Sequence, residues 1–547
     1  MRRPGPFNFR WRPVVKQCDY LIVGAGSAGS VLADRLSADG SRVLVLEAGG
    51  SDDDAMVKIP ALFAGMFQGP NDWNYNSEPE PGLHGRRLFL PRGKMLGGCS
   101  SLNALIYMRG ARTDYDRWVS DFGASGWSYD EVLPYFKRSE NNAEIHDEYH
   151  GRDGGLHVTR ERWLSPHAEP FIEAAAASGI ARNDDFNGAQ QDGTGLFQVT
   201  THRGRRCSAA DAFLRPAMER PNVEVVTGAL VRRVVLDAGR AVGVEYIENG
   251  FLHTAVADRE VILSAGAYNS PKILMLSGIG PADHLRDIGI DTVVDSPHVG
   301  QNLQDHPLTL LHWDTDSADT LGDLAQPAYM DQWLADGTGK LSSNAAESAV
   351  LWRSDSSLPA ADFQMVFVPG YFWDHGFRRP TVGGVTIGLS YNGPSSSGSV
   401  QLRSSDPTAP PRIVSNLLSQ QSEVDAVLRA IGLAEEIASR PELSATFGER
   451  VNPGRSVGKA ELAAWVRADT QHMYHPTSTC RMGVSGEGVV DPDLKVYGVE
   501  GLRVVDASIM PRIVSGNTNA PAIMIGERGA DLILGKSSNV AAEAVAV

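Results

Sequence analysis

The clearest chemistry in this sequence lies in a glycine-rich turn near its start. Gly24, Gly26 and Gly29 have the spacing GxGxxG, and Glu47 follows roughly 20 residues later. Such a turn lets a pyrophosphate approach the backbone at a helix N-terminus, and an acid after the next strand can bind ribose hydroxyls. The pattern predicts a dinucleotide site without distinguishing FAD from NAD. The other contacts expected in this site are Ser27, Ala28 and Ala48.

A histidine near the C-terminus, His475, has the chemistry of a base. It stands in residues 471–483 beside Pro476 and small hydroxyl residues, where a histidine is commonly a packed loop residue. A neutral imidazole accepts a hydroxyl proton near neutral pH, which alcohol oxidation requires. The residues alone leave both interpretations open. We interpret His306 and His472 as packed histidines.

Two further glycine-rich stretches narrow the function. Residues 91–103 end in GGCSSLN, and residues 266–280 read GAYNSPKILMLSGIG. They closely resemble the two signatures of the glucose-methanol-choline (GMC) oxidoreductase family, and the resemblance extends over about residues 19–534. It implies an FAD-dependent enzyme that oxidises a primary alcohol to an aldehyde, with hydride transfer to flavin N5. The nearest branch is that of choline-dehydrogenase-like and aliphatic alcohol dehydrogenases.

The resemblance also implies roles for individual residues. His475 becomes the base that abstracts the alcohol proton, and Asn517 becomes the partner that holds the alcohol oxygen. Leu102 stands where covalently flavinylated relatives carry histidine, so we expect FAD to be bound non-covalently. The remaining implied FAD contacts are Trp73, Arg92, Gly98, Ser101, Asn103, Ala104, Val231, Ala265, Asp506, Ala507, Asn519 and Pro521.

The substrate pocket is less well determined by the sequence. Phe372, Trp373, Met473 and Tyr474 are candidates for an apolar lining, although such residues are as often part of a core. Glu347 could hold a quaternary ammonium group together with aromatic rings, but it does not by itself indicate choline. No metal site is expected.

The elements that position these residues begin with a strand-helix-strand unit, formed by residues 19–23, 30–36 and 42–47. A β-meander on the same lobe is predicted from four strand-like segments, residues 223–226, 231–236, 241–247 and 256–264. Residues 307–453 alternate between turns and apolar runs, which predicts a separate antiparallel sheet with helices. A strand at residues 502–506 and a helix from about Pro521 to Gly535 should complete the first sheet.

The expected fold is therefore α/β, or α+β overall: a Rossmann-like FAD-binding domain and a separate antiparallel-sheet substrate-binding domain. We assign residues 18–160, 203–306 and 460–535 to the discontinuous FAD domain, residues 161–202 and 307–459 to the substrate domain, and residues 1–17 and 536–547 to flexible termini.

Composition limits the partners of this 547-residue chain. A net charge of -16, from 50 Lys and Arg against 66 Asp and Glu, argues against nucleic-acid binding. Four separated cysteines suggest neither a disulfide framework nor a zinc site, and no apolar run predicts a transmembrane segment. We expect a cytoplasmic enzyme for a small-molecule alcohol.

Several alternatives remain open at this point. The chain could be a choline dehydrogenase or oxidase, a hydroxynitrile-lyase-like enzyme with structural FAD, or a non-enzymatic flavoprotein. The electron acceptor could be oxygen or a quinone-like carrier, and a homo-oligomer is possible. Retention of both His475 and Asn517 argues against the non-enzymatic alternative.

Overall fold

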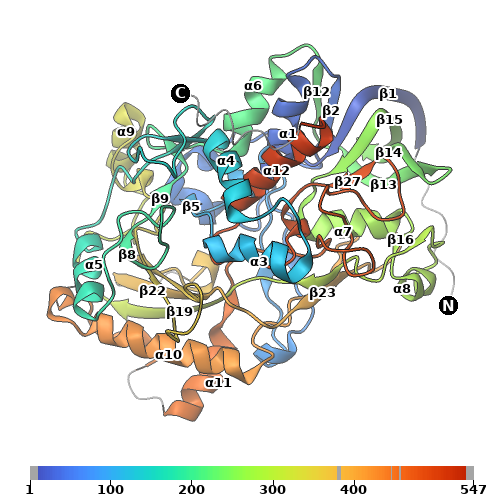
Figure 1. Ribbon diagram of the computed structural model, residues 1–547. Coiled ribbons are helices and arrows are strands. Elements are labelled where there is room, and N and C mark those ends of the chain that lie inside the picture. The colour runs from blue at the N-terminus through green and yellow to red at the C-terminus, as the bar shows by residue number, and fades with distance from the viewer. Residues whose placement is uncertain (1–9, 379–382, 445, 455–457, 537–547) are drawn as a thin grey trace.

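The computed structural model describes residues 10–378, 383–444, 446–454 and 458–536 (Figure 1). Residues 1–9 and 537–547, which belong to the expected flexible termini, lie outside these ranges. Two large sheets organise the described residues. No helix within these ranges is both long and apolar enough to cross a membrane.

The first sheet carries the glycine-rich turn. Its strand order is β12 (Val223–Val226), β2 (Val43–Leu46), β1 (Arg10–Val23), β15 (Phe251–Leu263), β14 (Arg240–Glu248) and β13 (Leu230–Asp237), and β27 (Leu502–Val504) also pairs with β15. Strands β12, β2, β1, β15 and β27 are parallel. The helix α1 (Ser27–Ser37) connects β1 to β2, which confirms the Rossmann-like unit.

Two expectations about this sheet are wrong. Only β13, β14 and β15 form the antiparallel meander, because β12 pairs in parallel with the buried strand β2 at the other edge. Strand β1 begins at Arg10, so residues 10–17 continue the strand beside β15 and do not form part of a flexible terminus.

The second sheet is antiparallel, as expected. Its order is β25 (Arg450–Asn452), β19 (Pro307–Asp314), β22 (Gly384–Tyr391), β21 (Phe363–Val368), β20 (Ser348–Trp352) and β8 (Gly193–Leu196), with β26 (Gln471–His472) also pairing with β19. Helices α5 (Ala168–Ala177) and α10 (Gln421–Ala438) pack against it. Both helices lie beside this sheet in Figure 1.

The domain division by residue number remains a proposal, with one revision. Helix α11 (Lys459–Asp469) packs on α10 and β19, and Val466 belongs to the core of the second sheet. Residues 459–472 therefore lie with the substrate domain, because their apolar side chains are buried there.

The C-terminal helix α12 (Asn519–Ile533) returns to the first lobe and packs beside α1 and α4 (Tyr129–Ser139), as Figure 1 shows. The fully buried Glu527 accepts hydrogen bonds from Arg35 of α1 over 2.7 Å and from Arg138 of α4 over 2.6 Å. A buried carboxylate with two guanidinium partners fixes the three helices relative to one another. The N-termini of α1 and α12 also lie close together, because Ser27 Oγ donates to Asn519 Oδ1 over 2.7 Å.

Candidate active site

A cavity of about 310 Å³ is lined by residues of both sheets. Its lining comes from the turn between β1 and α1, the loop before β5 (Ile106–Tyr107), the N-terminus of α12, and side chains of β19 and β21. Most residues selected from the sequence line it: Gly24, Gly26, Ser27, Ala28, Glu47, Ala48, Trp73, Arg92, Gly98, Asn103, Ala104, Val231, Ala265, Phe372, Met473, Tyr474, His475, Asp506, Ala507, Asn517 and Asn519.

Five of the selected residues do not line the cavity, and each has a structural reason. A Cβ on Gly29 would sit 2.0 Å from the Gly24 carbonyl oxygen, so this glycine packs the helix on the turn. Ser101 donates its hydroxyl to the Leu96 carbonyl, and Pro521 is buried in the first turn of α12. Glu347 and Trp373, expected to contact substrate, point elsewhere, as described below.

The glycine-rich turn has room for a dinucleotide. Gly24 has φ +101°, and a Cβ there would lie 2.5 Å from the Ser264 carbonyl oxygen. A Cβ on Gly26 would meet no protein atom closer than 3.9 Å, yet Gly26 lines the cavity. The space beside Gly26 is therefore kept open for something other than protein. Gly26 caps α1 without a side-chain hydrogen bond, which leaves the helix N–H groups for an anion.

Glu47 lies at the end of β2 in the same part of the cavity. Its carboxylate accepts hydrogen bonds from Ala25 N over 2.9 Å and from Gly49 N over 2.7 Å. Burial raises the pKa of Glu47 above its ordinary value, although these backbone groups oppose the shift. An acid fixed in this position fits the ribose-binding role expected from the sequence.

Three side chains form a directed chain of hydrogen bonds at the opposite end of the cavity. Gln364 Nε2 donates to Asn517 Oδ1 over 3.1 Å, so the Asn517 amide nitrogen faces His475. This nitrogen lies 3.2 Å from His475 Nε2. Since an amide NH₂ can only donate, His475 Nε2 must be the unprotonated nitrogen.

The other ring nitrogen of His475 completes this arrangement. His475 Nδ1 lies 3.0 Å from Nδ1 of His306, so the proton on His475 Nδ1 is donated to His306. His306 was interpreted from the sequence as a packed histidine, and that interpretation is incomplete because its ring contacts the candidate base. The sequence signal for it was that His306 lies within residues 19–534, over which the chain resembles the GMC family.

Asp305, which was not among the residues expected from the sequence, binds the backbone of both histidines. Its Oδ1 accepts the backbone N–H of His306 and that of His475, each over 2.8 Å. Tyr474 has φ +66°, a left-handed conformation that is uncommon for a residue with a side chain. Arg92 Nη2 donates to the Tyr474 carbonyl over 2.6 Å and stabilises this turn.

Both histidines are neutral at physiological pH. Burial lowers the pKa of His475 to about 3, and the neighbouring His306 adds to the shift. Burial also lowers the pKa of His306 to about 4. A neutral His475 has its lone pair on Nε2, to which the Asn517 amide donates. A ligand oxygen that takes the place of this contact can give its proton to Nε2.

Aromatic and aliphatic side chains form the wall near His475. The Phe67 and Tyr474 rings meet edge-on with centroids 5.9 Å apart, and those of Phe63 and Phe372 lie 6.0 Å apart. Trp373 instead stacks on His312 with centroids 4.9 Å apart, and the Arg378 guanidinium covers the indole ring.

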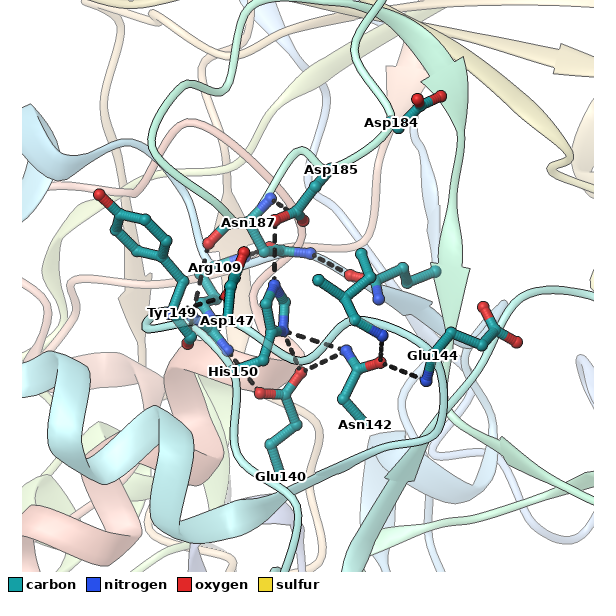
Figure 2. Close-up of polar contacts among 12 residues, drawn as sticks. Arg109, Glu140, Asn142, Glu144, Asp147, Tyr149, His150, Asp184, Asp185 and Asn187 are labelled. Atoms are coloured by element: carbon teal, nitrogen blue, oxygen red, sulfur yellow. Dashed lines mark hydrogen bonds and ion pairs between the residues drawn. The ribbon is translucent and has the colours of Figure 1, made fainter. Parts of the chain in front are cut away.

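The described residues contain one group of side chains with the composition of a metal site, Asp147, His150 and Asp185. Figure 2 shows the His150 ring between Glu140 and Asp185, with Nδ1 2.9 Å from Glu140 and Nε2 3.0 Å from Asp185. Burial opposes protonation, but the two carboxylates raise the pKa of His150 to about 9. His150 is therefore a cation itself and supplies the charge that a metal ion would bring.

Comparisons with known proteins agree with this geometry. Residues 18–308 and 394–526 match the two sequence models of the family described as GMC oxidoreductase. An oxygen-dependent choline dehydrogenase of Sinorhizobium fredii is 44% identical, over 95% of this chain and 96% of the relative. An uncharacterized GMC-type oxidoreductase of Mycobacterium bovis is 42% identical, over 94% and 99%.

Two solved oxidase structures are also similar to this chain over nearly its whole length. Pyridoxine 4-oxidase from Mesorbium loti has a TM-score of 0.86 and 31% identity, with 94% of this chain and 98% of that chain covered. A formate oxidase of Aspergillus oryzae, from a study of FAD modification, has a TM-score of 0.89 and 27% identity, with 96% and 99% covered.

Proposed function

Because this chain belongs to the GMC oxidoreductase family, it is an FAD-dependent enzyme acting on CH–OH donors, and we propose that it oxidises a primary alcohol to an aldehyde. In this proposal His475 is the base, and Asn517 is the group that holds the alcohol oxygen. FAD, when bound, supplies the hydride acceptor.

The residues of the cavity fit this cofactor. The open space beside Gly26, the free N–H groups of α1 and the Glu47 carboxylate suit the dinucleotide part. The N-terminus of α12 has no side-chain cap, and Asn519 Oδ1 accepts a hydrogen bond from Ser27 Oγ over 2.7 Å. The uncapped α12 N-terminus and the half-buried guanidinium of Arg92 suit a ring that becomes negative on reduction.

The observation that carries the proposal is the direction of the hydrogen bonds from Gln364 to His306. They place the lone pair of His475 on Nε2 and direct an Asn517 N–H towards that atom. An alcohol oxygen that comes between these two groups can give its proton to His475 Nε2 while it accepts the hydrogen bond of Asn517. Negative charge then develops on an oxygen that is already oriented, and this favours loss of hydride from the carbinol carbon.

The test is anaerobic reduction of the bound flavin by alcohols, followed by stopped-flow absorbance. A positioned base contributes roughly 100- to 10,000-fold, so His475→Ala should slow reduction by such a factor while FAD stays bound. Asn517→Ala should have a smaller effect, because it removes orientation and leaves the base. A fully FAD-loaded His475→Ala enzyme that is reduced at the wild-type rate across the pH range contradicts the proposal.

We also propose oxygen as the electron acceptor, ahead of a quinone-like carrier. The proposal is supported by relatives named oxygen-dependent choline dehydrogenases and by the likeness to pyridoxine 4-oxidase. Reoxidation of the reduced enzyme should be fast in air-saturated buffer. Slow reoxidation by air and fast reoxidation by a soluble quinone would favour the carrier.

A further inference from the structure

The cavity wall around His475 offers no free carboxylate to a cationic substrate, although relatives of this chain are named choline dehydrogenases. Among the described residues, the carboxylates that line the cavity are Glu47 and Asp506. Glu47 is held by two backbone N–H groups beside the glycine-rich turn. Asp506 accepts hydrogen bonds from Gly266 N over 2.9 Å and from Ser508 N over 2.8 Å. Neither is free to pair with a cationic substrate.

Two other acids lie near the substrate end without facing it. Asp305 is 2% exposed and uses Oδ1 to hold the backbone of both histidines. Glu347, the residue expected to meet a quaternary ammonium group, accepts hydrogen bonds from Ser165 N over 2.9 Å and from Ser165 Oγ over 2.6 Å.

Glu347 also interacts electrostatically with a second buried acid, Glu161. Burial raises the pKa of Glu347 to about 7. Burial and then the charge of Glu347 raise the pKa of Glu161 well above its ordinary value. At neutral pH Glu161 therefore retains a proton, and the carboxylate oxygens of Glu347 are held by Ser165 rather than turned to a ligand.

A cation, Arg92, lies beside the segment that carries His475, because its Nη2 donates to the Tyr474 carbonyl over 2.6 Å. Burial opposes its charge, but Cys99, Tyr268 and Asp305 raise the pKa of Arg92, so it stays charged. Much of the remaining lining is apolar or aromatic, and includes Phe63, Phe67, Leu308, Leu310, Val366 and Phe372, while the polar side chains Asn103, Asn344 and Asn517 are uncharged.

A quaternary ammonium group would have to leave water without a counter-ion and approach Arg92. Aromatic rings attract a quaternary ammonium group, but an ion that is buried without a counter-ion and beside another cation keeps a desolvation cost that no partner offsets. A neutral group of the same shape loses no hydration of charge and gains from burial against the apolar wall.

We therefore propose, resting on the proposed function, that the substrate is a neutral primary alcohol with a compact apolar tail, and that Leu308 selects against quaternary ammonium alcohols. Leu308 lines the cavity two residues beyond His306 and pairs with Gln471 of β26. Met473 N, two residues before His475, donates to the His306 carbonyl over 2.9 Å, so a carboxylate at position 308 would bring an anion to the part of the cavity wall that carries His475.

The test compares two alcohols of the same shape, choline and 3,3-dimethylbutan-1-ol, which differ in a charged nitrogen and a neutral carbon. Their dissociation constants are measured from perturbation of the oxidised flavin spectrum in FAD-loaded His475→Ala enzyme. Their specificity constants for flavin reduction are measured with the wild type. We expect the neutral alcohol to be preferred at least about tenfold in both, equivalent to about 1.4 kcal/mol. Equal or tighter binding of choline overturns the inference.

Matched variants test whether Leu308 determines the preference between the two alcohols. Leu308→Glu should shift the preference towards choline at least about tenfold relative to Leu308→Gln, which has nearly the same shape without the charge. Glu347→Gln should leave the ratio of the two alcohols unchanged. A loss of choline binding in Glu347→Gln, or the same ratio in both Leu308 variants, contradicts the assignment.

Failure of this inference can be separated from failure of the proposed function. If the neutral alcohol binds more tightly but no alcohol reduces the flavin of the wild type, the selectivity stands and the oxidation proposal fails. If choline binds and reduces the flavin best, the oxidation proposal stands and the selectivity fails.

Discussion

Gln364 Nε2 donates a hydrogen bond to Asn517 Oδ1 over 3.1 Å, and this bond sets the direction of the bonds to His475 and His306 that follow it. Gln364 is 1% exposed and comes from β21 of the second sheet, whereas Asn517 precedes α12 of the first lobe. Which ring nitrogen of the candidate base carries the proton thus depends on packing between the two lobes.

Gln364→Met should remove this control while it preserves side-chain length. With the Asn517 amide free to turn, flavin reduction should slow roughly tenfold, the equivalent of one hydrogen bond. Gln364→Glu provides a second test, because only its protonated carboxyl group can donate to Asn517. Its rate of flavin reduction should therefore be higher at low pH than at high pH.

His306 offers a matched control for the same chain of bonds. His306→Asn keeps an acceptor for the His475 Nδ1 proton, whereas His306→Leu removes it. The Asn variant should retain more of the reduction rate than the Leu variant, with the same FAD content. Equal rates in both variants would mean that His306 does not control the His475 tautomer.

The pH dependence of flavin reduction follows from the lowered pKa of His475, about 3. A base with a lowered pKa keeps its unprotonated form to a lower pH than an ordinary histidine. The rate should therefore be level between about pH 8 and pH 5 and fall only under more acidic conditions, rather than halve near pH 6.5. The measurement is the stopped-flow rate of flavin reduction across this pH range, with FAD retention checked at each pH. A midpoint near 6.5 would show that the base titrates like a solvated histidine.

FAD should be bound without a covalent bond, because Leu102, which lines the cavity and is 4% exposed, has no nucleophilic atom. Acid precipitation should release the yellow flavin into the supernatant. Washed protein that stays yellow in the pellet would contradict this.

His150 should stabilise the fold in its charged form. Its folded pKa, raised to about 9, lies above that of an unfolded histidine, so its contribution is complete below about pH 6.5 and is lost as pH rises through 9. His150→Gln should lower the thermal transition at pH 6.5 and reduce its fall between pH 6.5 and 9, since breaking a buried ion pair costs about 3–5 kcal/mol. The exposed His146, on the same segment, provides the control variant His146→Gln, which should leave both unchanged.

The sequence by itself determined the local elements and the family. The GxGxxG turn, the strand-helix-strand unit and the second antiparallel sheet are encoded by glycine spacing and hydrophobic period, which act over a few residues. The family signatures led to FAD and to the pair His475 and Asn517, which do lie together.

Only the tertiary structure decided what surrounds that pair. Glu347 and Trp373 have suitable side chains for a substrate pocket, yet Ser165 and His312 engage them elsewhere. His306, Asp305 and Gln364 are remote in sequence from Asn517, and no local pattern reveals that they meet. Which side chains meet depends on how two sheets pack, because orientation, burial and electric field at one atom arise from residues that are hundreds of positions apart.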